Sequence, residues 1–122
     1  MTNFQPRSCL EDDLETVRRA RSVYDARVRV LYSRYAVASR RAAAKADKAL
    51  RTAAHDWLHE AEMVVATDYD IVRFKAQIRY AEAHGRDPHG LCKTLGDLLT
   101  RNQDARKALP AVEAEFKRIL QE

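Results

Sequence analysis

The stretch from Arg7 to His84 contains neither glycine nor proline, the two residues that most often interrupt helices and form tight turns. The whole chain of 122 residues has only three of each. No segment shows the alternation of apolar and polar residues that is typical of a half-buried strand. The sequence therefore predicts an all-α protein with long helices, and its length fits one domain over residues 1–122.

A single long helix is predicted over about residues 8–66. Apolar or small residues recur from Leu10 to Val64 at the 3.6-residue period of an α-helix. Ser8 and Glu11 fit a capping box at its start, in which each side chain accepts from the other residue's amide. A break near residues 44–47 is allowed, since Asp47 can cap a new helix. The periodicity does not decide between a straight and a broken helix.

Three shorter helices are predicted after the long one, over about residues 68–84, 88–108 and 110–121. Thr67 or Asp68 can cap the first of them, and Gly85 suits the left-handed position that ends it. The pairs Asp87-Pro88 and Leu109-Pro110 place proline at the first turn of the next two, where its missing amide is not needed. We expect these helices to pack against one or both ends of the first.

The cellular compartment is predicted from what the sequence lacks. Its two cysteines, Cys9 and Cys92, do not make a disulfide framework. No apolar run approaches the roughly 18 residues of a membrane span, and the first residues lack the basic and then apolar order of a signal peptide. We therefore expect a cytoplasmic protein that does not contact a membrane.

Positive charge is concentrated in one part of the predicted long helix. Between Arg18 and Arg51 the chain carries eleven arginines and lysines but only two acids, Asp25 and Asp47. A solvated helix face would also be polar, but it usually mixes charges of both signs, because like charges repel. The excess therefore favours an acidic partner, unless acids from other helices neutralise it.

A second apolar row accompanies this charge. Val23, Val30 and Val37 lie seven residues apart and project onto the side opposite the predicted core face. Seven-residue spacing of β-branched residues is typical of a helix–helix seam, although three separate exposed valines would also be ordinary. The residues between them are small or polar, so a full leucine zipper is not expected. The predicted partner-binding residues are Val23, Arg27, Val30, Arg34, Val37 and Arg41. The partner would be a protein, and a second copy of the chain is the simplest one.

Nucleic acid is the alternative partner. Phosphate contacts need arginine and lysine on one accessible surface, and the sequence offers Arg18, Arg19, Arg29, Arg40, Lys45, Lys48 and Arg51. The tyrosines in this segment do not form a stacking platform, because Tyr24 and Tyr35 project toward the core. No helix-turn-helix with a set of base-reading residues is present. Binding would therefore be to the backbone and not to a sequence.

Enzymatic chemistry is not favoured. His55 and His59 lie one helical turn apart, as in zinc-binding helices, but Asp56 stands where those helices carry a glutamate base. Two histidines flanking a core tryptophan are a simpler explanation. The sequence has no phosphate-binding glycine loop and no Ser/His/Asp arrangement. We therefore predict no metal, no cofactor and no catalytic site.

These features together predict a small, non-enzymatic helical protein that binds a macromolecular partner through the basic outer face of its long helix. Inhibitors and assembly factors of phages or mobile elements are proteins of this type. The alternative is a protein that binds the nucleic-acid backbone through the segment from Arg18 to Arg51.

Overall fold

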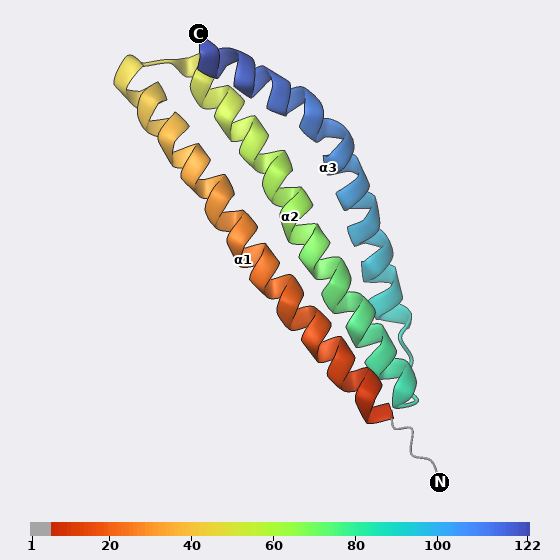
Figure 1. Ribbon diagram of the computed structural model, residues 1–122. Helices are drawn as coiled ribbons and strands as arrows, with labels where there is room; N and C mark the ends of the chain where they lie inside the picture. Colours follow the sequence, from red (N-terminus) through yellow and green to blue (C-terminus); the bar gives the residue numbers. More distant parts are fainter. Residues whose placement is uncertain (1–5) are drawn as a thin grey trace.

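The computed structural model describes the chain from residue 6 onward, with side chains from Asp13, and that part folds into three long helices (Figure 1). They are α1 (Pro6–Lys45), α2 (Lys48–Ala83) and α3 (His89–Gln121), of 40, 36 and 33 residues. The predicted all-helical content is confirmed. The predicted arrangement of one long helix with about three shorter ones is wrong, because the three helices are of similar length. The proposed capping box at Ser8 and Glu11 lies outside the described side chains.

The single helix over residues 8–66 does not form, because the chain reverses direction between α1 and α2. Ala46 takes a left-handed conformation with φ of 50°, and the carboxylate of Asp47 accepts from the amide of Leu50 at 2.9 Å, which caps α2. The reversal falls near residues 44–47, where the sequence allows a break in the helix. A straight rod would leave its apolar stripe uncovered, whereas the hairpin buries the stripe of α1 against that of α2.

The helix start expected at Thr67 or Asp68 is also wrong, since α2 runs through both residues. The hydroxyl of Thr67 donates back to the carbonyl of Met63 at 2.6 Å, one turn earlier in the same helix. A threonine that bonds in this way is compatible with a continuous helix. Asp68 binds side chains of the neighbouring helices and not a helix end.

The turn between α2 and α3 lies where the sequence placed it. Gly85 is left-handed, with φ of 67°, and the amide of Arg86 donates to the carbonyl of Ala81 at 2.8 Å. This is the bond of a Schellman helix end, in which glycine is the preferred residue. Asp87 then accepts from the amide of His89 at 3.0 Å as α3 begins.

A helix boundary at Leu109-Pro110 was predicted but does not occur, since Pro110 lies inside α3. Proline removes one backbone hydrogen bond and bends a helix without always ending it. Pro110 is exposed, so that the carbonyl left without its amide partner can meet water. α3 is bowed along its length and follows the side of α2 (Figure 1).

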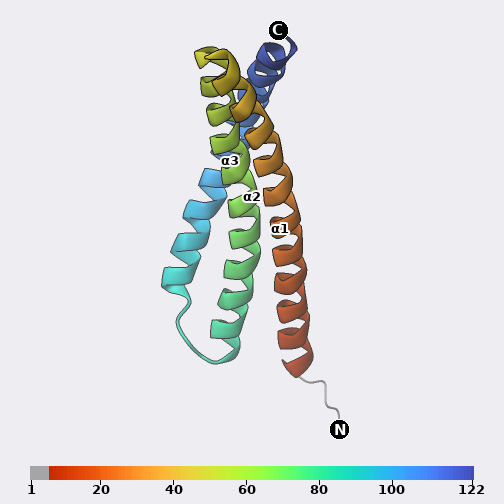
Figure 2. The same cartoon turned by 90° about the vertical axis from the view of Figure 1, so that its left-hand side faces the viewer.

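The central helix is α2, which packs against both α1 and α3, while α1 and α3 make few direct contacts (Figure 2). The largest buried cluster lies toward the α1–α2 turn, near the C-terminus. Phe116 and Ala54 are fully buried there, and Trp57 packs against Phe116 with 5.1 Å between ring centroids. Alanines of both α1 and α2 are buried in this cluster, namely Ala38, Ala42, Ala53, Ala54 and Ala61. Farther from the turn, the space between α1 and α3 opens into a groove.

Candidate docking face on α1 and the adjoining groove

The valine row predicted to bind a partner is exposed. Val23, Val30 and Val37 are 55%, 67% and 58% exposed, respectively, although valine is among the residues most often buried. They do not lie opposite the core face of α1, as the helical projection suggested. Val23 and Val30 instead line hollows whose floor is α2, including Val65. Val30 therefore lies at the edge of the space between α1 and α3, Val23 lies at a hollow between α1 and α2, and Val37 lines neither of these two hollows.

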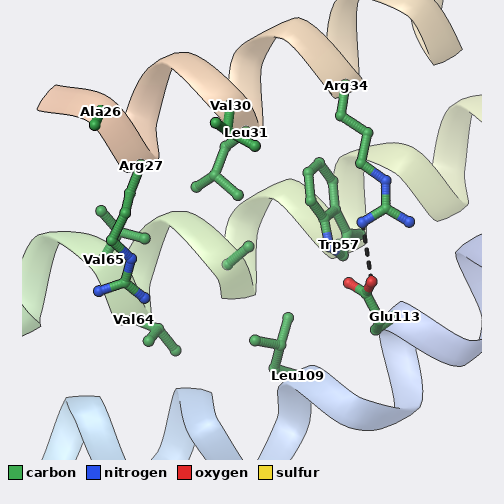
Figure 3. A pocket seen from close by; sticks show the side chains of 11 residues that line it. Ala26, Arg27, Val30, Leu31, Arg34, Trp57, Val64, Val65, Leu109 and Glu113 are labelled. Atoms are coloured by element: carbon green, nitrogen blue, oxygen red, sulfur yellow. Dashed lines mark hydrogen bonds and ion pairs between the residues drawn. The ribbon is translucent and has the colours of Figure 1, made fainter. Parts of the chain in front are cut away.

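This α1–α3 groove has a mainly apolar lining. Its larger hollow has a volume of about 420 Å³, with Trp57, Ala61 and Val65 as its floor and Leu109 of α3 on the far side (Figure 3). A smaller hollow of about 190 Å³ contains Val23 and shares Arg27 and Val65 with the first. Val23 and Val30 thus join the exposed row to the two hollows along the middle of α1.

Arg34 crosses the groove and joins α1 to α3. Its guanidinium donates to Glu113 at 2.9 Å, and the two side chains point toward each other in Figure 3. The same guanidinium lies 4.5 Å from the ring centroid of Trp57 and 4.7 Å from that of Phe116, within cation–π range. Burial acts to raise the pKa of Glu113, but the hydrogen bond and the charge of Arg34, together with Trp57 and Lys117, lower it by more, so that the pKa is lowered overall.

Asp68 holds a second polar bridge between all three helices. Its carboxylate accepts from Arg27 of α1 at 2.8 Å and from Arg106 of α3 at 2.8 Å. It also accepts from the buried amide of Asn102 at 2.8 Å. Burial acts to raise the pKa of Asp68, but these bonds prevail and lower it. Arg27 therefore has a carboxylate partner within its own chain.

The two bridges change the charge that the predicted docking face presents. Arg27 and Arg34 were expected to flank the valines as free cations, and each is paired internally. The sequence does not reveal the ion pair between Arg27 and Asp68, because Asp68 also fits the start of a helix. It does not reveal the ion pair between Arg34 and Glu113, because these residues lie far apart in the chain. The one available signal was the excess of arginine on α1, which acids from other helices could neutralise.

The remaining cations of the basic segment divide into two groups. Arg18 and Arg19 pair with Glu15, and Arg21 pairs with Asp25. The others make no ion pair within the part of the chain that the structure describes, namely Arg29, Arg40, Arg41, Lys45, Lys48 and Arg51. All of these except Arg29 lie within about two helical turns of the α1–α2 turn. We call these five residues the basic turn cluster.

Asp47, the acidic residue closest to this cluster in the sequence, makes no ion pair with its cations in the part of the chain that the structure describes. Asp47 lies between Lys45 and Lys48, but its carboxylate caps α2 by accepting from the amide of Leu50. Arg41 is half-buried, whereas the other four cations of the basic turn cluster are exposed. An accessible positive surface thus remains at one end of the molecule.

The histidine pair offers little for metal chemistry. His55 and His59 are both exposed and share a shallow hollow with Asp56, Glu60 and Val112. Among the described residues, no group of three or more histidine, cysteine or acidic side chains is arranged to hold a metal ion.

The main surface features within the described residues are an apolar groove, an exposed valine row and a cluster of cations. None of the helices in this part is both long and apolar enough to cross a membrane. The chain matches no protein-family model, no curated protein and no solved structure.

Proposed function

We propose that the chain is a non-enzymatic interaction protein that binds another macromolecule, most simply a protein, through the exposed valine row of α1 and the adjoining groove. The observation that carries this proposal is the exposure of Val23, Val30 and Val37 in one row beside an apolar groove. Single exposed valines need no explanation, but an aligned row continuous with a groove is typical of a binding surface.

The charge along the row supports a docking face. From Ala26 to Ala46, α1 and the turn after it contain no acidic residue. Arg29 and Arg40 are exposed and have no ion-pair partner in the described part of the chain. A protein partner would contact an apolar strip that is bordered by positively charged side chains. An inhibitor or assembly factor of a phage or mobile element would use such a surface by covering part of its target.

The test is whether a change in the row removes the chain from a complex without unfolding it. We expect tagged protein from its own cells to elute on size exclusion in a complex larger than its 14.0 kDa. Val30→Asp should shift it to its own mass. Gln103→Asp, at an exposed position on α3, is the matched control and should leave the complex intact. Identical elution of wild type and Val30→Asp would refute the proposal.

A second candidate function is binding of the nucleic-acid backbone, and the basic turn cluster favours it. Internal pairing leaves the accessible positive charge mainly at the α1–α2 turn, so the expected contact is smaller than the whole segment from Arg18 to Arg51. Five cations at one end of a rod can contact phosphates without any base-reading element.

Binding to DNA and RNA across a salt series tests this candidate. Affinity should fall as salt rises, with the logarithmic slope growing by about 0.9 for each phosphate contacted on duplex DNA. Replacing both Lys45 and Lys48 by glutamine should weaken binding and flatten the slope. The same change at Lys75 and Lys93, which are exposed on α2 and α3, should not. Absence of binding at low salt would remove the candidate.

A further inference from the structure

We propose that the α1–α3 groove receives an amphipathic helix of a protein partner, with apolar side chains along its middle and a carboxylate at each end. This inference rests on the proposed function and specifies the chemistry of its partner. It begins from the two ends of the groove. Figure 3 shows Arg27 and Arg34 at opposite ends of the larger hollow, with Val30 and Leu31 between them.

The end at Arg27 carries more positive than negative charge. Asp68 is shared by Arg27 and Arg106, so that two cations surround one carboxylate and the sum is +1. The side chain of Asp68 is 27% exposed, whereas those of Arg27 and Arg106 are 42% and 54% exposed. Within the described residues, Arg27 donates only through Nη1, although a guanidinium has five N–H groups. A carboxylate of a partner can therefore bind Arg27 without displacing Asp68.

The end at Arg34 carries the same excess. Glu113 accepts from Arg34 at 2.9 Å and lies 3.6 Å from the ammonium group of Lys117, so that the sum is again +1. The side chain of Lys117 is 61% exposed, whereas that of Glu113 is 28% exposed. Both ends of the groove thus present positive charge to the outside, and charge complementarity selects an anionic partner.

The surface between the two ends is apolar and extends along α1. Arg27 and Arg34 are seven residues apart in the sequence, which is about 10 Å along a helix axis. Val30 lines the groove and is also exposed, so that a small ligand held only in the groove would leave part of this surface uncovered. A helix that lies along the groove can place apolar side chains in it at intervals of one turn.

Acidic residues about seven positions apart in the partner helix would reach both ends of the groove. Nucleic acid is also anionic, but its phosphates supply no apolar side chains for the surface between these ends. The observations therefore favour an acidic, amphipathic helix for this groove.

A designed peptide tests this chemistry with the full chain. The probe is an alanine-based helix of about 15 residues, without tryptophan, with leucines one turn apart on one face and two glutamates about seven residues apart at the ends of that face. The control peptide has lysine in place of both glutamates. Trp57 is the only tryptophan of the chain and lines the groove, so its fluorescence reports binding there.

We expect the acidic peptide to bind more tightly than the basic one. Its affinity should fall as salt rises, because salt screens the attraction between exposed charges. Equal affinity for the two peptides would overturn the proposal, and so would the absence of any change in Trp57 fluorescence with the acidic peptide at low salt.

Two substitutions on α3 remove the excess charge and leave both bridges from α1 in place. Arg106→Gln combined with Lys117→Gln should raise the Kd of the acidic peptide about fivefold, since an exposed ion pair contributes roughly a factor of two or three. Arg101→Gln combined with Lys107→Gln is the matched control and should leave the Kd unchanged. Both of its positions are exposed on α3, and circular dichroism would verify that each variant stays folded.

An unchanged Kd in the variant of Arg106 and Lys117 would also overturn the proposal. Loss of peptide binding on replacing Lys45 and Lys48 by glutamine would then place the acidic peptide at the basic turn cluster. If the peptide does not bind while Val30→Asp still releases the chain from its cellular complex, the proposed function stands with a partner of different chemistry.

Discussion

Arg34 of α1 donates to Glu113 of α3 at 2.9 Å while its guanidinium covers the rings of Trp57 and Phe116. Because α1 and α3 otherwise make few contacts, this pair and the bridge at Asp68 are polar links between the two helices. The same arginines that suggest a basic docking face on sequence grounds are therefore structural links inside the domain.

Replacing Glu113 by glutamine should destabilise the fold. The change leaves Arg34 partly buried over two aromatic rings without a carboxylate, and loss of a hydrogen bond to a charged group costs about 1–3 kcal/mol. The free energy of unfolding in urea measures this. Glu115→Gln is the control, since Glu115 forms an exposed pair with Arg118, and it should change stability by less than about 0.5 kcal/mol. Equal effects would contradict the role of Arg34.

Stability should fall in acid through Asp68 and Glu113. Both have a lower pKa in the folded protein than their ordinary values of 3.8 and 4.5. The stability that each contributes is therefore complete above its ordinary pKa and is lost as the pH falls through the lower, folded-state pKa. Urea unfolding from roughly pH 5 to pH 2 should show this loss. The double variant Asp68→Asn, Glu113→Gln should show a flatter profile, and an unchanged profile would refute the assignment.

The core at the turn end should dominate stability. Phe116 is fully buried against Trp57, so Phe116→Ala should cost about 3–5 kcal/mol in free energy of unfolding. Leu99→Ala is the comparison, because Leu99 is a large apolar residue on the same helix that is 40% exposed. Thermal or urea unfolding of both variants gives the difference. A smaller cost at Phe116 than at Leu99 would mean that α3 is not anchored there.

Substitutions in the valine row should leave the fold intact. Val23→Ser, Val30→Asp and Val37→Ser change exposed side chains, and such changes usually alter stability by less than about 0.5 kcal/mol. The new acid at position 30 also lies within one turn of Arg27 and Arg34. Urea unfolding of each variant at low protein concentration checks this. A loss of several kcal/mol would place the row in the core of the domain and not on a docking face.

Local signals in the sequence predicted much of the secondary structure. Gly85 and Asp87 mark the α2–α3 turn by their backbone preferences, and Asp47 marks the start of α2. Thr67 and Pro110 carry equally strong local signals, but tertiary packing overrides them. The 3.6-residue period could not reveal the hairpin, because both arms bury alanine-rich stripes that continue the same pattern across the turn.

The candidate site was only partly predictable for a related reason. The valine row is a pattern within one helix, so its spacing is visible in the sequence, and all three valines are exposed in the structure. The pairing of Arg34 with Glu113 joins residues that only the packing of α3 on α2 brings together. Charge counting along one helix therefore could not show which cations have partners.

Site-specific photo-crosslinking tests most directly the claim that the exposed valine row of α1 is a docking face. A benzophenone amino acid would replace Val30 in one version of the chain and Gln103, on the exposed side of α3, in another. After irradiation in the cells that make the protein, position 30 should give a discrete adduct, either with a second copy or with another macromolecule, and position 103 should give none. No adduct at position 30, or the same adducts from both positions, would contradict the account.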